Sequence, residues 1–429
     1  MSNDYEMKDG ILFFTANLYE EDIELFEGFW PVPHGVSINS YLVKGEKSAL
    51  IDLSYDGASA KEQISAQLKE AGVDLATVDY LVLNHLEPDH TGTLPELLAI
   101  NPGIEIICTE KAAKLVAAFY GEARVRTVKT GDKLDLGAGK VLSFLEIPNV
   151  HWPETMATYE ESQKVLFSCD AFGGFGALED SEFDDELQGG EKAFYKGEAL
   201  RYYVNIVGSF SNFVNGALEK IEKAGLDISV VAPSHGLVWR KNPREIFDWY
   251  RQFASYMEGP ADPSVTLVWS SMYGNTGALV DSIVEGVRSE NVDINIFRVP
   301  QDHVSFILPE AYRSAGLILG MPTYEYKMFP PMSWAIDIFS RKHVWNKHVL
   351  RFGSYGWSGG AQKELTEMAD RLKLKWTFAD PVEWQGRPTE EVKRRAFEAG
   401  ADFAREIKEK AGGKGSPGFW AVSPDSESD

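Results

Sequence analysis

Short apolar runs alternate with segments of helical spacing along the first 259 residues. Such runs are typical of buried strands, and apolar positions three and four apart are typical of amphipathic helices. The predicted strands are residues 39–43, 48–53, 80–83, 104–108, 125–129, 141–147, 155–160, 164–168 and 228–232. The predicted helices are residues 58–71, 92–100, 110–119, 199–224 and 242–257, with Gly208 and Gly216 favouring a break in the fourth. This mixture predicts sheets packed between helices.

The pattern becomes more regular after the segment Gly-Pro-Ala-Asp-Pro at residues 259–263, which cannot continue a helix and is the predicted linker. Strand–loop–helix units follow, and such units are typical of a doubly wound parallel sheet. Five strands are predicted, at residues 265–269, 293–299, 316–320, 349–353 and 377–379. The resulting domains are residues 1–259 and 260–411. The Gly-, Ser-, Pro- and acid-containing tail 412–429 is predicted to be disordered, with Phe419-Trp420 as a chance aromatic pair.

Composition and charge exclude several classes of function. The 429 residues carry 42 Lys and Arg against 65 Asp and Glu, a net charge of −23. So acidic a chain argues against binding to nucleic acid or to an anionic membrane surface. The two cysteines, Cys108 and Cys169, are too few for a disulfide framework or a four-thiolate metal site. We find no signal peptide and no membrane-spanning run, so a soluble, cytoplasmic protein is expected.

Candidate metal ligands follow several predicted strands. His85-Leu86-Glu87-Pro88-Asp89-His90 comes directly after strand 80–83, and three further candidates each follow a later strand. Four histidines and three carboxylates exceed what one tetrahedral ion needs, so they predict a site for two metal ions. Three carboxylates and a hydroxide would balance two divalent ions. The predicted ligands are His85, Glu87, Asp89, His90, His151, Asp170 and His235.

The alternative interpretation is that these histidines only pack in the core. We give that interpretation to the other four histidines, His34, His303, His343 and His348, because none of them belongs to the pattern. Chance is a poor account of the remaining four, since all of them follow strands beside carboxylates.

The pattern H-x-x-x-D-H after a strand, followed by distant His, Asp and His residues, resembles the metallo-β-lactamase superfamily. Most zinc hydrolases of that group have histidine where this chain has Glu87, and a hard oxygen ligand shifts the preference from zinc towards iron or manganese. Together with His-Trp-Pro at 151–153, the segments 37–43 and 232–236 and the second domain, the chain resembles the flavodiiron proteins over nearly all of residues 1–411. The resemblance implies a metallo-β-lactamase-like αββα sandwich followed by a flavodoxin-like domain.

The resemblance also implies roles for the candidate residues. One iron would be bound by His85, Glu87 and His151, the other by Asp89, His90 and His235, and Asp170 would bridge them. The residue equivalent to His90 is not a ligand in every member of the family. Aromatic residues shape the site in this family. Four are available here, with core packing as the alternative for each: Phe29, Trp30, Tyr202 and Tyr203.

Three loops of the second domain predict a flavin site. Ser271-Met272-Tyr273-Gly274-Asn275-Thr276 links the first strand to its helix, where hydroxyl and backbone N–H groups suit a phosphate. It contains neither a Walker A lysine nor G-x-G-x-x-G. Two other loops follow strand ends, where doubly wound sheets bind ligands. The residues concerned are Pro322, Thr323 and Tyr324, then Ser354, Tyr355, Gly356, Trp357, Ser358 and Gly359. They resemble the FMN loops of flavodoxins and flavodiiron proteins.

The resemblance implies reduction of dioxygen to water, of nitric oxide to nitrous oxide, or both. Electrons would pass from an external donor, such as rubredoxin or a reduced deazaflavin, through FMN to two iron ions. The donor is expected to be separate because the chain has no C-x-x-C pair for a rubredoxin of its own. The family forms head-to-tail homodimers or dimers of dimers, which bring the FMN of one subunit near the irons of the other.

Two other functions fit parts of the sequence. A zinc-dependent hydrolase with an appended flavodoxin-like domain would use the same fold, but Glu87 and the seven-residue ligand set argue against it. An electron carrier with a degenerate first domain would need only the flavin, but the candidate ligands are complete.

Overall fold

The computed structural model describes residues 5–177, 181–259 and 261–410. The chain divides into two compact units, Met1–Ala254 and Ser255–Asp429. The sequence predicted the join slightly later, between residues 259 and 260. The predicted tail 412–429, with Phe419 and Trp420, lies outside the described residues.

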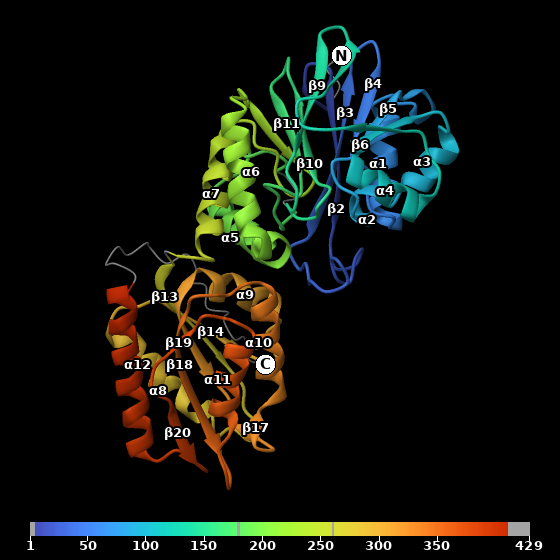
Figure 1. Ribbon diagram of the computed structural model, residues 1–429. Coiled ribbons are helices and arrows are strands. Elements are labelled where there is room, and N and C mark those ends of the chain that lie inside the picture. Colours follow the sequence, from blue (N-terminus) through green and yellow to red (C-terminus); the bar gives the residue numbers. More distant parts are fainter. Residues whose placement is uncertain (1–4, 178–180, 260, 411–429) are drawn as a thin grey trace. The chain divides into compact units, whose positions relative to one another are not determined.

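Two sheets form the centre of the first unit (Figure 1). One has the order β1-β2-β3-β4-β5-β6-β7, antiparallel from β1 to β4 and parallel from β4 to β7. The other has the order β12-β11-β10-β9-β8, in which only β11 and β12 are parallel. The strands are β1 (Glu6–Lys8), β2 (Ile11–Leu18), β3 (Val36–Lys44), β4 (Ser48–Ile51), β5 (Tyr80–Val82), β6 (Glu105–Thr109), β7 (Val125–Val128), β8 (Lys133–Gly137), β9 (Lys140–Glu146), β10 (Met156–Glu160), β11 (Val165–Cys169) and β12 (Val230–Pro233).

Helices lie outside both sheets of this unit, which gives the predicted αββα layers (Figure 1). Beside the first sheet are α1 (Ala58–Glu70), the short 3₁₀ turn Leu75–Thr77, α2 (Pro88–Thr91), α3 (Leu94–Ile100) and α4 (Glu110–Tyr120). Beside the second are α5 (Glu191–Tyr202), α6 (Ser211–Lys223) and α7 (Pro243–Ser255). The fold class predicted for this part of the chain is therefore confirmed.

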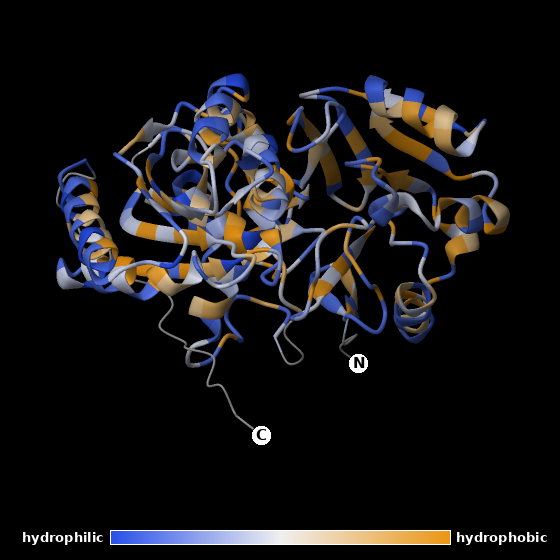
Figure 2. Ribbon diagram, turned by 90° about the horizontal axis from the view of Figure 1, so that it is seen from below, coloured by the Kyte–Doolittle hydropathy of each residue, from blue (hydrophilic) through white to orange (hydrophobic). Residues whose placement is uncertain are grey.

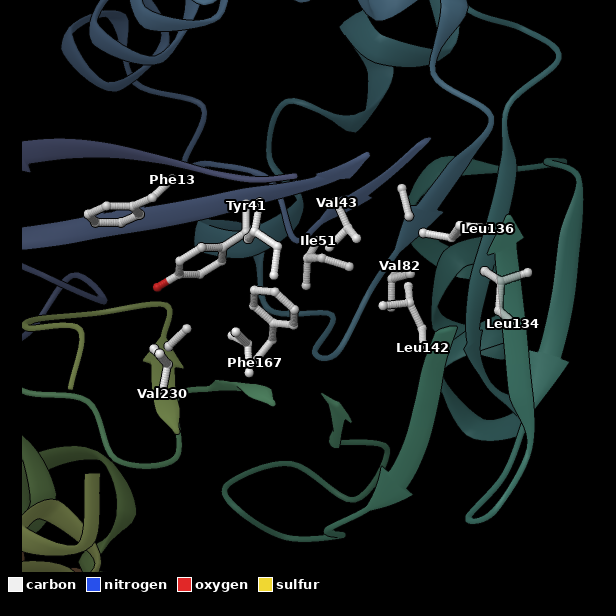
Figure 3. Packing of buried hydrophobic residues seen from close by; sticks show 14 of the residues in the cluster. Phe13, Tyr41, Val43, Ile51, Val82, Leu134, Leu136, Leu142, Phe167 and Val230 are labelled. Carbon is white, nitrogen blue, oxygen red and sulfur yellow. The ribbon is translucent and has the colours of Figure 1, made fainter. Parts of the chain in front are cut away.

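Alternate residues of the facing strands fill the space between the two sheets. Phe13 of β2 and Tyr41 of β3 meet Leu142 and Phe167 from the second sheet in one buried cluster (Figure 3). Strands β1, β2 and β8 were not predicted. β2 is buried along almost its whole length, so its residues do not alternate between apolar and polar as those of a half-buried strand would.

The predicted helix 199–224 is interrupted, as Gly208 suggested. α5 runs into a π-helical turn at Tyr203–Val207 and a 3₁₀ turn at Gly208–Phe210 before α6 begins. No break occurs at Gly216, which lies inside α6. Single π turns within helices often lie at functional sites.

The second unit is a doubly wound parallel sheet with the order β14-β13-β15-β18-β19, and β20 also pairs with β18. Its strands are β13 (Asp262–Trp269), β14 (Ile294–Arg298), β15 (Ser314–Gly320), β18 (His348–Tyr355), β19 (Thr377–Phe378) and β20 (Val382–Gln385). The predicted fifth strand, 377–379, corresponds to β19, whereas β20 was not predicted. A small hairpin, β16 (Thr323–Tyr324) and β17 (Lys327–Met328), projects after β15.

Helices cover both faces of this sheet (Figure 1). α8 (Val280–Ser289), which follows a 3₁₀ turn at Gly277–Leu279, packs with α12 (Glu390–Lys410). The other face carries α9 (Val304–Arg313), α10 (Pro330–Arg341) and α11 (Ala361–Arg371). α9 was not predicted, and it contains Pro309, a residue that usually ends a helix.

Hydrophobic and hydrophilic residues are interleaved along the helices, as expected for helices with one buried side (Figure 2). Within the described ranges, no helix has the length and apolar character needed to cross a membrane.

Candidate functional site

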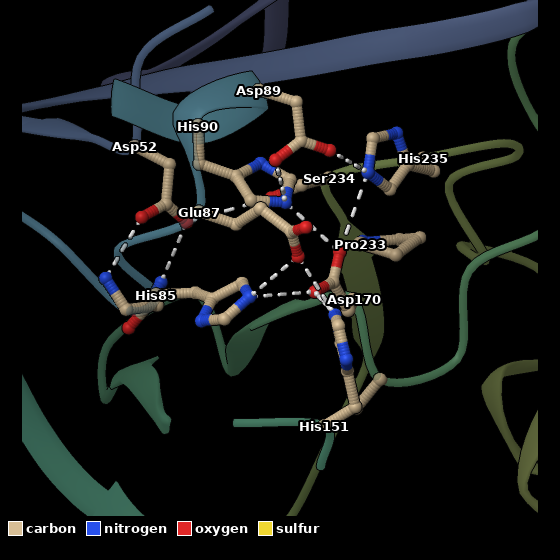
Figure 4. Close-up of polar contacts among 12 residues, drawn as sticks. Asp52, His85, Glu87, Asp89, His90, His151, Asp170, Pro233, Ser234 and His235 are labelled. Carbon is tan, nitrogen blue, oxygen red and sulfur yellow. Dashed lines mark hydrogen bonds and ion pairs between the residues drawn. The ribbon is translucent and has the colours of Figure 1, made fainter. Parts of the chain in front are cut away.

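The seven predicted metal ligands come together at strand ends of the first unit (Figure 4). His85, Glu87, Asp89 and His90 lie between β5 and the end of α2. His151 lies in the β9–β10 loop, and Asp170 and His235 follow β11 and β12. Parts of the chain far apart in sequence therefore place their polar side chains at one location.

One group of ligands surrounds Oδ2 of Asp170. His85 Nε2 lies 3.2 Å and His151 Nε2 3.3 Å from this oxygen. Glu87 Oε2 completes the group, 3.3 Å from His85 Nε2 and 2.9 Å from His151 Nε2. The group thus combines imidazole nitrogens with carboxylate oxygens, and both zinc and iron bind these two kinds of ligand atom.

A second group surrounds Oδ1, the other oxygen of the same carboxylate. His90 Nε2 lies 2.9 Å and His235 Nε2 3.3 Å from Oδ1. Asp89 Oδ2 lies 3.2 Å from His235 Nε2, and Asp89 Oδ1 lies 3.5 Å from His90 Nε2. Asp170 therefore stands between two groups that each add two histidines and one carboxylate, which is the arrangement of a bridging ligand.

Several atoms in these groups are buried and make no well-aligned hydrogen bond to any described residue. They are Asp89 Oδ1, His151 Nε2, Asp170 Oδ2 and His235 Nε2. Buried polar atoms are normally hydrogen-bonded, so a set of them directed at common points calls for a missing partner. Because the set contains both lone-pair nitrogens and carboxylate oxygens, cations fit it well.

Mutual attraction between histidines and carboxylates shifts the pKa values of both. Burial disfavours the charged form of His151, but the nearby carboxylates of Asp170 and Glu87 outweigh burial and raise its pKa to about 9. The same balance, with Asp170 and Asp89 as partners, raises the pKa of His235 to about 10. For Glu87, hydrogen bonds from His151 and His85 outweigh burial and lower the pKa to about 2. Without metal, the cluster thus holds protons where cations would bind.

The outer ring nitrogens of two histidines are held by neighbours. His85 Nδ1 lies 2.7 Å from Oε1 of Glu154, which also accepts from the backbone N–H of Leu86. His235 Nδ1 donates to the backbone carbonyl of Ser37 at 2.8 Å. Such contacts fix the tautomer and leave Nε2 free for a metal. The sequence analysis missed Glu154, although it comes three residues after His151 in the same loop.

The two sequence segments that supported the family resemblance contact each other. The backbone N–H of Asn39 donates to Ser234 O at 2.8 Å, and its side-chain amide donates to Pro233 O and Gly236 O. Asp52 accepts from the backbone and side chain of Asn84, next to His85. These buried contacts hold the loops that carry His85 and His235.

The aromatic candidates differ in their positions. Tyr202 donates from its hydroxyl to Asp170 Oδ1 at 3.2 Å, whereas the Tyr203 hydroxyl contacts Ser211 at 2.7 Å and its ring meets Tyr250. Trp30 is buried, with Phe29 packed against it at 4.5 Å between ring centroids. A residue that sequence reasoning missed, Phe26, lies edge-on to the His235 ring at 5.4 Å.

The three predicted flavin loops lie together at the carboxyl ends of β13, β15 and β18. Thr276 Oγ1 is 3.0 Å from Ser354 Oγ, which joins the first loop to the third. Thr323 Oγ1 accepts from the backbone N–H of Ala361, which joins the second to the third. Ser270, at the start of the first loop, has a buried hydroxyl without a hydrogen-bond partner among the described residues.

Aromatic side chains on these loops are exposed rather than packed in the core. Tyr273 is 87% exposed, Trp357 76% and Tyr324 41%. Met272 is also exposed, and Tyr355 is half-buried. Apolar groups gathered at strand ends in this way indicate a binding surface, because packing in the core cannot account for them.

Residues 36–236 match a family described as ODP family beta lactamase. A nitric oxide reductase from Moorella thermoacetica is 32% identical over 413 residues, which cover 95% of this chain and 100% of that protein. An anaerobic nitric oxide reductase flavorubredoxin from Aeromonas hydrophila is 36% identical over 354 residues, 80% of this chain and 70% of that protein.

Solved structures of similar fold point to the same family as these relatives. Rubredoxin oxygen:oxidoreductase from Desulfovibrio gigas has a TM-score of 0.86 and 26% identity, covering 95% of this chain and 99% of that one. A mutant flavo di-iron protein from Thermotoga maritima has a TM-score of 0.83 and 29% identity, covering 94% and 98%. The fold and site define a metallo-β-lactamase-like domain with paired metal-ligand groups, joined to a flavodoxin-like domain. The chain belongs to the flavodiiron proteins.

Proposed function

We propose that this chain is an oxidoreductase that reduces dioxygen to water, nitric oxide to nitrous oxide, or both, at a diiron centre. The observation that carries the proposal is the position of Asp170, whose two carboxylate oxygens each face two histidines and one further carboxylate. Against the zinc-dependent hydrolase stands Glu87 in the first group, a hard oxygen ligand that favours iron over zinc. The names of the relatives from Moorella and Desulfovibrio support the two reactions.

His85, Glu87 and His151 would bind one iron ion, Asp89, His90 and His235 the other, and Asp170 both. Three carboxylates compensate most of the charge of two ferrous ions, so the pair can be held in a buried site. When bound, the iron pair supplies electrons and open coordination positions for a diatomic gas.

The surrounding residues of this chain orient the ligands and limit access to them. Glu154 and the Ser37 carbonyl fix the rings of His85 and His235. Tyr202 holds Asp170 through a hydrogen bond and, together with Phe26, places aromatic surface against His235. An apolar wall on one side of a polar site excludes water while admitting a small apolar gas.

The loops of the second unit would bind FMN, with the Ser271–Thr276 loop around the phosphate and Tyr324 and Trp357 beside the ring. Neutral hydroxyls and backbone N–H groups suffice for a phosphate at a helix N-terminus. The electrons would come from a separate donor, such as a rubredoxin or a reduced deazaflavin. A head-to-tail homodimer, or a dimer of dimers, in a reducing cytoplasm completes the proposal, and the free, buried Cys108 and Cys169 are compatible with that compartment.

The test combines cofactor content with reactivity. Purified protein should contain iron and FMN, and anaerobically photoreduced protein should be reoxidised when it is mixed with dioxygen or nitric oxide. Zinc without iron would instead favour the hydrolase. Flavin that stays reduced under both gases would overturn the oxidoreductase proposal.

A further inference from the structure

The first unit contains a cavity of about 270 Å³ between its first sheet and the helices α1 and α3. Its walls are mostly apolar, with hydroxyls from Ser40, Ser54 and Thr93. Phe14 and Leu50 extend from the outer face of the sheet, and Ile64, Leu68 and Leu97 extend from the helices. All five are buried. The cavity is larger than the roughly 150 Å³ engineered cavities that stay dry and bind benzene or xenon.

The mouth of the cavity determines which molecules can enter. Lys61 lies there, with its Nζ 2.6 Å from Asp56 Oδ1 and 3.3 Å from Glu96 Oε1. Two carboxylates against one amine leave the mouth negatively charged, so fatty acids and other anions are repelled. Ser65 adds only a neutral hydroxyl. The combination of an apolar interior and an acidic mouth selects uncharged, apolar molecules.

One wall of the cavity is hydrogen-bonded to the segment that carries the candidate ligand His90. Leu53 lines the cavity, and its backbone N–H donates to the carbonyl of His90 at 2.9 Å. Thr93 and Ser54 also line it and are joined by a backbone hydrogen bond of 3.2 Å. The cavity lining is therefore directly connected, through the backbone of Leu53, to the segment that carries His90.

We propose that this cavity binds small, uncharged, apolar molecules, and that it holds dioxygen or nitric oxide next to the metal site. Both gases are apolar diatomics and favour an apolar space over water. The binding of apolar molecules rests on the cavity alone, whereas the holding role rests on the proposed function.

Xenon is the probe for binding. Crystals of the full chain pressurised with xenon should show the atom in this cavity, and benzene should raise the melting temperature of the protein. Ser65→Trp should block the mouth and Leu97→Phe should fill the interior, and each should abolish both effects. Ala66→Trp is the matched control, because Ala66 is exposed on the same helix and does not line the cavity. A cavity without xenon in the unmodified protein would overturn the proposal.

Steady-state kinetics test the holding role. In Ser65→Trp, the KM for the dissolved gas should rise about threefold with kcat unchanged, whereas Ala66→Trp should behave as the parent. Xenon should compete with the gas in the parent protein and in Ala66→Trp, but not in Ser65→Trp. If xenon binds to the parent protein but Ser65→Trp leaves KM unchanged, the cavity does not serve the reaction. If the protein reduces neither gas, the proposed function fails, while xenon binding still reports on the cavity.

Discussion

The hydroxyl of Tyr202 lies 3.2 Å from Oδ1 of Asp170, the carboxylate that stands between the two ligand groups. The hydroxyl is the donor, because burial and the charge of Asp170 raise the pKa of Tyr202 well above its usual value. The next residue, Tyr203, points elsewhere, to Ser211 and Tyr250. The π turn that begins at Tyr203 accompanies this divergence.

Replacing Tyr202 by Phe should weaken metal binding without unfolding the protein. The variant loses one donor to Asp170, and outer partners of metal ligands are worth about 10- to 100-fold in metal affinity. We expect about tenfold weaker retention of one metal equivalent, measured by chelator competition. Loss of one hydrogen bond costs about 1 kcal/mol of stability.

Tyr203→Phe is the control for this prediction. It removes an equally buried hydroxyl one residue away, whose partner is Ser211. Its stability should fall by a similar amount while its metal affinity stays that of the parent. Equal metal retention in both variants would show that the Tyr202 hydrogen bond does not support Asp170.

Glu154→Gln should affect the group that contains His85. Glu154 Oε1 accepts from His85 Nδ1 at 2.7 Å, and an amide in its place can present its NH₂ group instead and favour the wrong ring tautomer. Metal affinity should fall by about 10- to 100-fold. Metal analysis after dialysis should show the loss at one of the two positions.

Glu160→Gln is the matched control, since Glu160 is fully buried on β10 but accepts only from Ser162 and Gln163. It should lose stability and keep its metals. If both glutamine variants lost metal alike, general destabilisation would explain the result, and the role of Glu154 would be refuted.

The clustering of the seven candidate ligands could be predicted from the sequence because each follows a strand with a clear apolar run, and strand ends gather at one edge. The contacts of Glu154 and Tyr202 could not, because they depend on the path of a loop and on a π turn. The second unit also combines features that could be predicted from the sequence with features that could not. Its doubly wound parallel sheet followed from repeated strand–loop–helix units, but the additional strand β20 did not, since it is only four residues long.

Metal binding should release protons at neutral pH. The pKa of His151 is raised to about 9 and that of His235 to about 10 by their carboxylate partners, so both rings are protonated in the metal-free protein. A metal must displace these protons, so its apparent affinity should rise with pH and level off near pH 10. Calorimetric titration with Mn²⁺ in buffers of different ionisation enthalpy measures the released protons. Binding without proton release at pH 7 would contradict this prediction.

The same shifts predict how the stability of the metal-free protein depends on pH. A folded-state pKa above the unfolded value of 6.5 stabilises the fold fully below pH 6.5, and the contribution is lost as the pH rises through about 9 to 10. Urea unfolding of the first unit in metal-free protein should show this decline, and saturating metal should remove it.

Trp357→Ala should weaken FMN binding without loss of stability. The side chain is 76% exposed, and its indole N–H makes one long hydrogen bond, 3.3 Å, to Tyr326. Exposed substitutions change stability by about 0.5 kcal/mol or less. The dissociation constant of FMN, measured by flavin fluorescence, should rise about tenfold, since aromatic stacking on one face is lost. Unchanged FMN affinity would remove Trp357 from the flavin site.

Lys347 should make the second unit less stable at neutral pH than in mild alkali. Its amine is buried and donates to the carbonyls of Tyr312 and Ser314 at 2.6 and 2.8 Å. Burial lowers the pKa to about 7 from 10.5, against a smaller opposing effect of Asp262. Between these values the unfolded chain binds more protons, so the free energy of unfolding should rise with pH, by on the order of 4 kcal/mol across the window.

Lys347→Met should flatten this dependence in urea unfolding at pH about 6.5 and 9.5. Lys363→Met, at a position 81% exposed, should leave it unchanged, and parallel pH curves for all three proteins would refute the assignment.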